Sequence, residues 1–179
     1  MPTYIVFLRA VNVRPRWVKM ALLRELLSDN AFSDVETYIQ SGNLRLQTPM
    51  RSAVKVRAEL ERLIEAEFGF QVPCVVRTPA ALAEVAAYAE GLASPYPDGE
   101  ARRYVTFCAE PVTADASDLL QDWEEPGERL RVHGSEVYWW LTKPAHQAKM
   151  TNARLEKTVG DATTRDIKVV RTLAERWGS

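Results

Sequence analysis

The sequence predicts an α+β fold of two ferredoxin-like (β-α-β-β-α-β) subdomains packed together, with extra helices. Three observations support this prediction. Strand and helix patterns alternate in that order through the first half of the chain. A stretch rich in Gly, Pro, Ser and Asp follows, and beyond it the same order begins again. We therefore expect a first subdomain plus a helix over 1–90, a linker over 91–102, and a second subdomain plus a C-terminal helix over 103–179.

The first half opens on a continuous apolar run over 3–11, broken only by Arg9. Such a run is typical of a central strand that is covered on both faces. Leu23 and Leu27 recur at helical spacing, which predicts the first helix. The elements expected in this half are a helix over 18–30, strands over 35–40 and 43–48, a helix closed by Gly69, a strand over 72–77 and a helix that begins at Pro79.

The second half repeats the pattern after the linker. Both alternating sets of residues in 136–141 are apolar, so we expect both faces of this strand to be covered, most simply by the other subdomain. The elements expected here are a strand over 103–108, a helix over 116–123, strands over 130–133 and 136–141, a helix from Thr151 to Gly160, a short strand near Thr163 and a final helix from about Asp166.

A Gly/Ser pair separates two strand patterns at the same place in each half. Ser41-Gly42 occupies this position in the first half and Gly134-Ser135 in the second. Each pair predicts a tight hairpin turn. A turn alone does not dictate the side chains of Gln40 and Asn43 beside it, so these two remain candidates for ligand contact.

Composition narrows the classes of function. The 179 residues include 46% hydrophobic and 26% charged residues, an ordinary globular balance. The net charge of -1 provides no general attraction for nucleic acid, and the aromatic residues of the strands are better explained as core. No apolar stretch approaches the length of a membrane span, and the N-terminus lacks the basic region of a signal peptide. We expect a cytoplasmic protein.

Neither a metal nor a cofactor is expected. Cys74 and Cys108 lie in apolar runs, which favours buried free thiols over a disulfide. Together with His133 and His146 they do not form the spacing of a metal site. The sequence also lacks a nucleophile motif and a glycine-rich phosphate loop, so it leaves open whether the protein is an enzyme.

Two groups of polar residues are candidates for a ligand site. Arg9 interrupts an apolar strand and needs either a structural acceptor or a ligand, and Asn12 follows three residues later. In the C-terminal part, donors gather around two helix starts, which bind anions readily, although helix capping alone explains some of them. The candidate ligand-binding residues are Arg9, Asn12, Gln40, Asn43, Lys149, Thr164 and Arg165.

Three hypotheses follow from these residues. The leading one is a binding module that holds an anionic small molecule or a partner at the seam between the subdomains. The alternative is a small enzyme that acts on a phosphorylated or nucleotide substrate, with Lys149 and Thr164 contributing. Nucleic-acid binding is the weakest of the three. Catalytic residues, the identity of the ligand and the oligomeric state do not follow from the sequence.

Several short motifs resemble the bacterial domain-of-unknown-function family 1697. They are Leu8-Arg9, Asn12-Val13, Lys19-Met20-Ala21, the string TYIQSGN over 37–43, and Thr163-Thr164-Arg165-Asp166. The chain departs from the family where Ala10 replaces a usual Gly, where Arg14-Pro15 stands in place of Gly-Gly, and where Asp166 replaces Asn. The resemblance implies the α+β fold with two ferredoxin-like subdomains, and it implies no activity.

Overall fold

The computed structural model describes residues 1–9, 11 and 15–179. The described residues form two four-stranded antiparallel sheets and six α-helices, which confirms the predicted α+β class. The chain divides into two compact units, one of Met1–Ala83 with Leu173–Ser179 and one of Glu84–Thr172. Asn12, one of the candidate ligand residues, lies outside the described residues.

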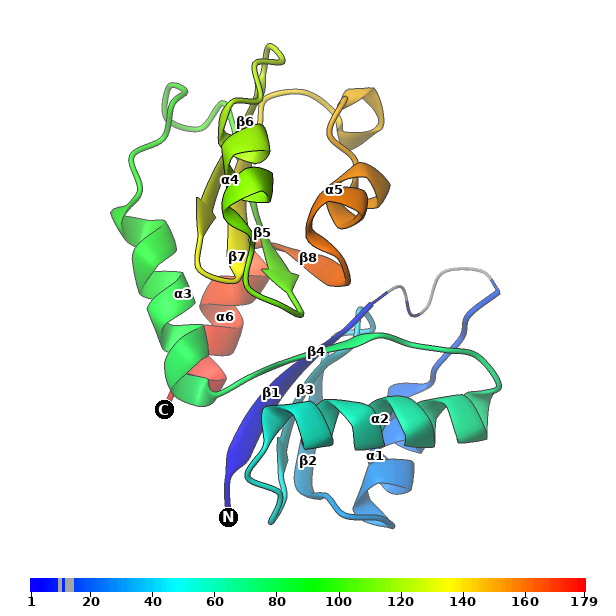
Figure 1. The fold of residues 1–179 in the computed structure, drawn as a ribbon. Coiled ribbons are helices and arrows are strands. Elements are labelled where there is room, and N and C mark those ends of the chain that lie inside the picture. The colour runs from blue at the N-terminus through cyan, green and yellow to red at the C-terminus, as the bar shows by residue number, and fades with distance from the viewer. Residues whose placement is uncertain (10, 12–14) are drawn as a thin grey trace. The chain divides into compact units, whose positions relative to one another are not determined.

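The first sheet has the strand order β2-β3-β1-β4, the ferredoxin-like arrangement that the element order predicts (Figure 1). Because β1 pairs with both β3 and β4, it occupies a central position. This position explains its unbroken apolar sequence. The elements are β1 (Thr3–Leu8), α1 (Met20–Ser28), β2 (Ser33–Tyr38), β3 (Asn43–Gln47), α2 (Ala53–Phe68) and β4 (Cys74–Arg77).

The second sheet repeats this topology with the order β6-β7-β5-β8. Two further helices, α3 (Pro79–Gly91) and α6 (Ile167–Trp177), are the extra helices of the prediction. The elements are β5 (Arg102–Cys108), α4 (Ala114–Gln121), β6 (Glu128–His133), β7 (Glu136–Leu141), the 3₁₀ helix η1 (Ala145–Gln147), α5 (Asn152–Val159) and β8 (Ala162–Asp166).

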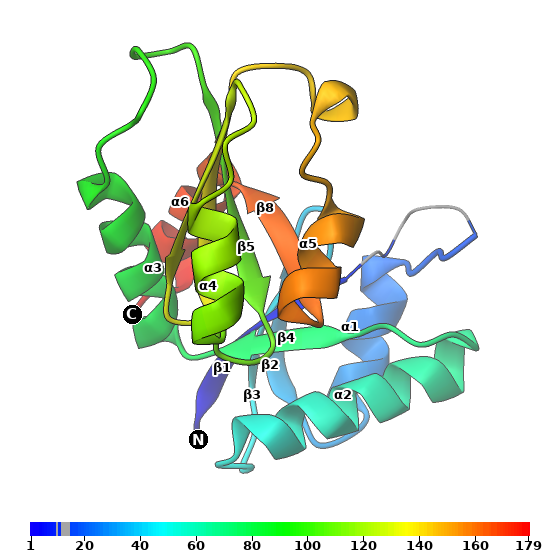
Figure 2. The same cartoon turned by 45° about the horizontal axis from the view of Figure 1, so that its top comes forward.

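Helices α1 and α2 cover one face of the first sheet (Figure 2). Leu23 and Leu27 of α1 and Leu60 of α2 are fully buried there, as the helical spacing predicts. Gly69 ends α2 in the left-handed conformation with a φ of 80°. The strand side chains of this core alternate along β1, with Tyr4, Val6 and Leu8 packed toward the helices.

Strand β7 is buried along its whole length. Val137 and Trp139 pack into a core with Leu120 of α4 and Leu155 of α5. On the opposite face, the Tyr138 ring contacts the ring of Tyr88 at 4.9 Å between centroids. Helix α3, which carries Tyr88, therefore covers part of the second face, and this explains why both alternating sets of β7 are apolar.

Both cysteines are free and buried, as expected. Burial raises the pKa of the Cys74 thiol, the nearby Glu61 adds to this effect and Arg57 opposes it. A thiol of this kind is unreactive at neutral pH. Over the residues that the structure describes, we find no helix long and apolar enough to cross a membrane.

Candidate functional site

The loop between β2 and β3 is longer than the sequence suggests. Tyr38 pairs with Asn43, so four residues, Ile39 to Gly42, connect the strands instead of the predicted two. In the second unit, His133 pairs with Glu136, and Gly134-Ser135 is the predicted two-residue turn. Gly134 has a φ of 62°, which glycine adopts readily at the first central position of a tight hairpin turn.

The buried Asn43 side chain stabilises the four-residue loop through hydrogen bonds. This side chain is fully buried, and its Nδ2 donates to the Tyr38 carbonyl at 2.8 Å and to Ser41 Oγ at 3.0 Å. Asparagine can bond to nearby backbone in this way, which stabilises turns. The geometry thus gives Asn43 a structural role in shaping the loop.

Gly42 allows the loop to pack against the end of β1. The Leu8 N–H donates to the Gly42 carbonyl at 2.8 Å. A β-carbon on Gly42 would lie 2.7 Å from Leu8 Cβ and 2.9 Å from Val11 Cγ2, and the φ of 86° disfavours any other residue. Only glycine therefore permits the close approach of the loop to β1.

A cavity of about 320 Å³ lies between this loop and the beginning of α1. Lys19, Met20 and Ala21 contribute one part of its lining, and Ile39 and Gln40 of the loop contribute another. Arg24 and Thr37 complete the lining, and the Arg24 guanidinium donates to the Thr37 hydroxyl. This bond fixes Arg24 and uses one of its five N–H donors.

The cavity has an electropositive lining. The part of the lining that the structure describes includes Lys19 and Arg24 but no carboxylate. Among the described residues, the exposed Lys19 ammonium has no ion-pair partner. Lys19 is also the N-cap of α1; its side chain makes no capping hydrogen bond, and the first turn has no acidic residue. The first N–H groups of a helix have no intrahelical acceptor, so this end of α1 favours negative charge.

Three predicted site residues of the first unit, Arg9, Gln40 and Asn43, lie around the same end of its sheet. Gln40 lines the cavity, and Asn43 closes the loop that carries Gln40. Arg9 directly follows β1 and is partly buried, and its backbone N–H donates to the Pro73 carbonyl at 3.0 Å. Sequence reasoning missed Lys19, Arg24 and Thr37, although a lysine in place of the usual Ser, Thr, Asp or Asn at the helix start was an available signal.

The predicted site residues of the second unit do not form one cluster. Thr164 and Arg165 are consecutive in β8, so their side chains lie on opposite faces of the sheet. The Thr164 hydroxyl bonds to Asn152 Oδ1 at 2.9 Å and to the Thr106 hydroxyl at 2.7 Å. The Lys149 side chain is exposed, and the Lys149 backbone N–H donates to Glu128.

Arg165 is buried on the other face. Its Nη1 donates to Thr163 Oγ1 at 2.7 Å and to the Thr164 carbonyl at 3.0 Å. Burial lowers the pKa of the guanidinium to about 10, because the charged form loses its hydration. The group remains cationic at neutral pH.

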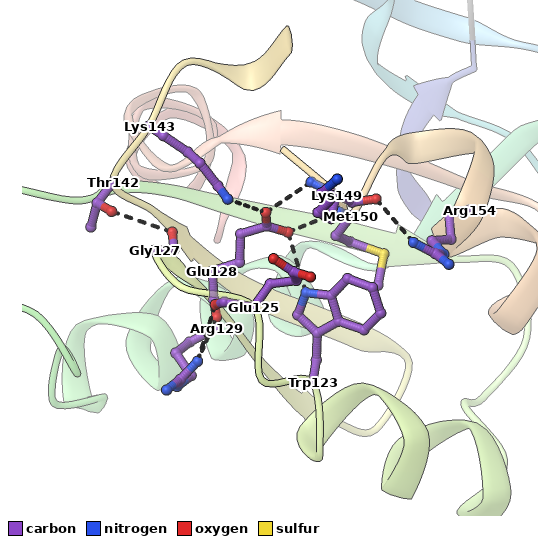
Figure 3. Close-up of polar contacts among 10 residues, drawn as sticks. All are labelled: Trp123, Glu125, Gly127, Glu128, Arg129, Thr142, Lys143, Lys149, Met150 and Arg154. Atoms are coloured by element: carbon purple, nitrogen blue, oxygen red, sulfur yellow. Dashed lines mark hydrogen bonds and ion pairs between the residues drawn. The ribbon is translucent and has the colours of Figure 1, made fainter. Parts of the chain in front are cut away.

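Glu128 is a buried carboxylate that sequence reasoning missed. It accepts hydrogen bonds from the Lys149 and Met150 N–H groups at 2.8 Å and from Trp123 Nε1 at 3.2 Å, and it pairs with Lys143 Nζ at 2.8 Å (Figure 3). Burial acts to raise the pKa of Glu128, but these donors outweigh it and hold the pKa below the ordinary value. The available signal was the alternation of Glu128 with Leu130 and Val132.

Comparison with known proteins is consistent with this description. A family model described as protein of unknown function (DUF1697) matches residues 1–138. The solved structure of the conserved bacterial protein SP0830 from Streptococcus pneumoniae is similar, with a TM-score of 0.71 and 22% identity over 97% of each chain, and it shows the same fold. No functionally curated protein matches. Because the family model covers well over half of its residues, this chain belongs to the DUF1697 family.

Proposed function

We propose that the protein is a binding module for a small anionic molecule and that the cavity between α1 and the β2–β3 loop holds this ligand. One observation carries the proposal: among the described residues, the cavity lining includes the cationic side chains of Lys19 and Arg24 and no carboxylate. Its volume of about 320 Å³ lies at the lower end of the range for small-molecule pockets. That size suits a compact ligand with one or two charged groups.

The donor set supports an oxyanion as the ligand. Arg24 keeps most of its N–H donors beyond the bond to Thr37, and a guanidinium suits carboxylate and phosphate oxygens. The side-chain amide of Gln40 adds a neutral donor to the lining. The uncapped first turn of α1 adds backbone N–H groups and a favourable dipole.

The second unit supports the proposal as an internal comparison. The topological equivalent of α1 is α4, which begins at a conventional cap: Thr113 accepts a hydrogen bond from the Ala116 N–H, and Asp115 places an acidic group in the first turn. The hairpin beside it has two loop residues instead of four. The same topology is therefore stable without a cationic, uncapped helix start or the longer loop.

The backbone of Ile39 also supports a functional loop. Ile39 has a φ of 51°, a conformation that costs a β-branched residue about 1–2 kcal/mol. Its side chain is 48% exposed, so burial of the side chain does not offset this cost well. Strained residues gather at binding sites, where the surrounding structure holds them. Ile39 lines the cavity and would supply an apolar wall for the ligand.

Titration with pyrophosphate, followed by calorimetry and amide chemical shifts, tests the proposal. Lys19→Ala combined with Arg24→Gln should weaken binding about tenfold or more, because each removed charge contributes about 1 kcal/mol or more to anion binding. Lys55→Ala is the matched control, since Lys55 is an exposed lysine of α2 in the same unit. Equal affinity in the double variant and the control, with folding intact, would refute the assignment.

The enzymatic alternative has less support from the geometry. Thr164 bonds to a threonine hydroxyl and an asparagine oxygen, neither of which is a general base. The hydroxyl is thus engaged in packing α5 against β8. Turnover of a phosphorylated substrate that is lost in Thr164→Val would favour the enzymatic hypothesis over simple binding.

A further inference from the structure

The second unit contains a larger cavity, of about 620 Å³, at one end of its sheet. This volume is typical of sites for small organic ligands. The lining combines charged groups with apolar ones and comes from the beginning of β5, the end of β7 and the segment that follows β7. The residues that matter here are Glu100, Arg102, Leu141, Lys143, Pro144 and His146.

One wall of this cavity is held in place by Glu128. The segment from Thr142 to Met150 contains only the short helix η1, yet it is anchored at both ends. At its start, the Thr142 N–H donates to the Gly127 carbonyl at 2.9 Å, and Lys143 pairs with Glu128. At its end, the Lys149 and Met150 N–H groups donate to the same carboxylate (Figure 3).

Holding a loop with a buried carboxylate has a cost in free energy. Burying a carboxylate costs several kcal/mol unless its partners compensate, and Glu128 is only 2% exposed. Its four donors compensate and also determine the position of the segment. A loop positioned in this way can form a defined cavity wall without regular secondary structure.

Arg102 provides the charge that is available to a ligand. Lys143 forms an ion pair with Glu128. The exposed Arg102, by contrast, has no ion pair with any residue in the described part of the chain. Leu141 pairs with Arg102 on one side and with Glu128 on the other, so the three side chains share one face of the sheet. A guanidinium thus stands beside the apolar Leu141.

We propose that this cavity binds a small organic anion, a carboxylate or sulfonate with an attached apolar group. Arg102 would bind the acid group and His146 would add a donor, while Leu141 and Pro144 would contact the apolar part. Glu100 lies in the lining as the opposing charge and would favour a ligand of low charge over a polyanion. This site is independent of the cavity in the first unit.

Fluorescence titration with 8-anilinonaphthalene-1-sulfonate tests this site, because the dye joins a sulfonate to an apolar body. Arg102→Met should raise its Kd about tenfold, as expected for loss of a charge-assisted bond. Glu100→Gln should lower the Kd. Arg131→Met is the matched control, since Arg131 is an exposed arginine of the same unit outside this cavity lining.

A neutral probe separates this site from nonspecific apolar binding. N-phenyl-1-naphthylamine has the same aromatic body without the sulfonate, and it should bind weakly and respond equally to Arg102→Met and Arg131→Met. The proposal is overturned if the sulfonate dye binds Arg102→Met and the unmodified protein with the same Kd, or if the neutral probe binds as tightly as the dye. Circular dichroism verifies that each variant is folded.

Discussion

Asn43 and Glu128 are buried polar side chains that shape a loop in each unit. Asn43 bonds to the backbone and hydroxyl of its own loop, whereas Glu128 collects donors from a segment about twenty residues away in the chain. Buried polar groups are tolerated when their hydrogen bonds are complete. In both cases the bonds hold a loop that lines a cavity or lies next to one.

We predict that Glu128→Gln destabilises the protein by about 2 kcal/mol at pH 7, because it removes a charge that accepts several hydrogen bonds. The folded-state pKa of Glu128 is depressed below 4.5. Its contribution to stability is therefore present above about pH 4.5 and is lost as the pH falls through the folded-state pKa. Urea unfolding at pH 7 and at pH 3.5 should show the difference between the two proteins shrinking at the lower pH.

The control for this prediction is Glu124→Gln, which changes an exposed glutamate near β6. Exposed charges of this kind contribute little to stability, so the control should unfold like the unmodified protein at both pH values. A pH-independent loss of stability in Glu128→Gln would contradict the prediction, since it would show that the negative charge is not what the donors stabilise.

Residue patterns predicted the apolar core well and the buried carboxylate poorly. The spacing of Leu23 and Leu27 identified buried positions because apolar burial follows helical periodicity. Glu128 stands close to the acidic pair Glu124-Glu125 and to Pro126-Gly127, a polar context that does not predict a buried carboxylate. Two of its four donors are backbone N–H groups of a distant segment, which leave no trace in side-chain composition.

The β2–β3 loop is one element in which the two units differ. Ser41-Gly42 resembles a two-residue turn in the sequence, but the connection begins at Ile39. A β-branched residue prefers extended backbone, so its left-handed conformation is not expected from the sequence. The ends of α5 were predictable, by contrast, because Thr151 and Gly160 act through local capping chemistry.

We predict that Ile39→Gly stabilises the protein while it weakens pyrophosphate binding. Glycine adopts a φ of 51° without strain, and part of this gain is offset by the greater freedom of glycine in the unfolded chain. A net gain of about 0.5–1 kcal/mol should raise the melting temperature by about 1–4 °C. Differential scanning calorimetry measures the stability, and calorimetric titration measures the binding.

Val54→Gly is the matched control for the loop variant. Val54 is 77% exposed and lies in the first turn of α2, where the backbone is helical. Glycine there should cost roughly 0.5 kcal/mol, because it loses helix propensity without relieving strain. If Ile39→Gly lowers the melting temperature as the control does, the left-handed conformation of Ile39 is not a cost to the fold.

At the scale of the whole molecule, the order of strands and helices predicted the fold, and the candidate site did not follow from it. The order of the elements and the alternation of apolar residues are enough to predict each sheet. The cavity in the first unit joins Lys19 to Gln40, two residues far apart in the sequence that the fold brings together. Both lie in the motifs that carry the family resemblance, which sequence reasoning identified without assigning them to a common site.

The first unit also includes the last seven residues of the chain, Leu173–Ser179. Trp177 is only 3% exposed, and its Nε1 donates to Glu36 Oε2 of β2 at 3.2 Å. The Arg176 guanidinium lies 4.9 Å from the centre of the Tyr38 ring, also in β2. The end of α6 therefore supports the strand that leads into the β2–β3 loop.

We predict that Trp177→Ala destabilises the first unit by about 3 kcal/mol, because a large buried side chain and its hydrogen bond are both lost. Hydrogen exchange should speed up for amides of β1, β2 and β3, which belong to that unit, while amides of β7 keep their protection. Trp17→Ala is the control, because Trp17 is 58% exposed and belongs to the same unit. Equal loss of protection in β7 would show that the two units unfold as one and would contradict the assignment of Trp177 to the first unit alone.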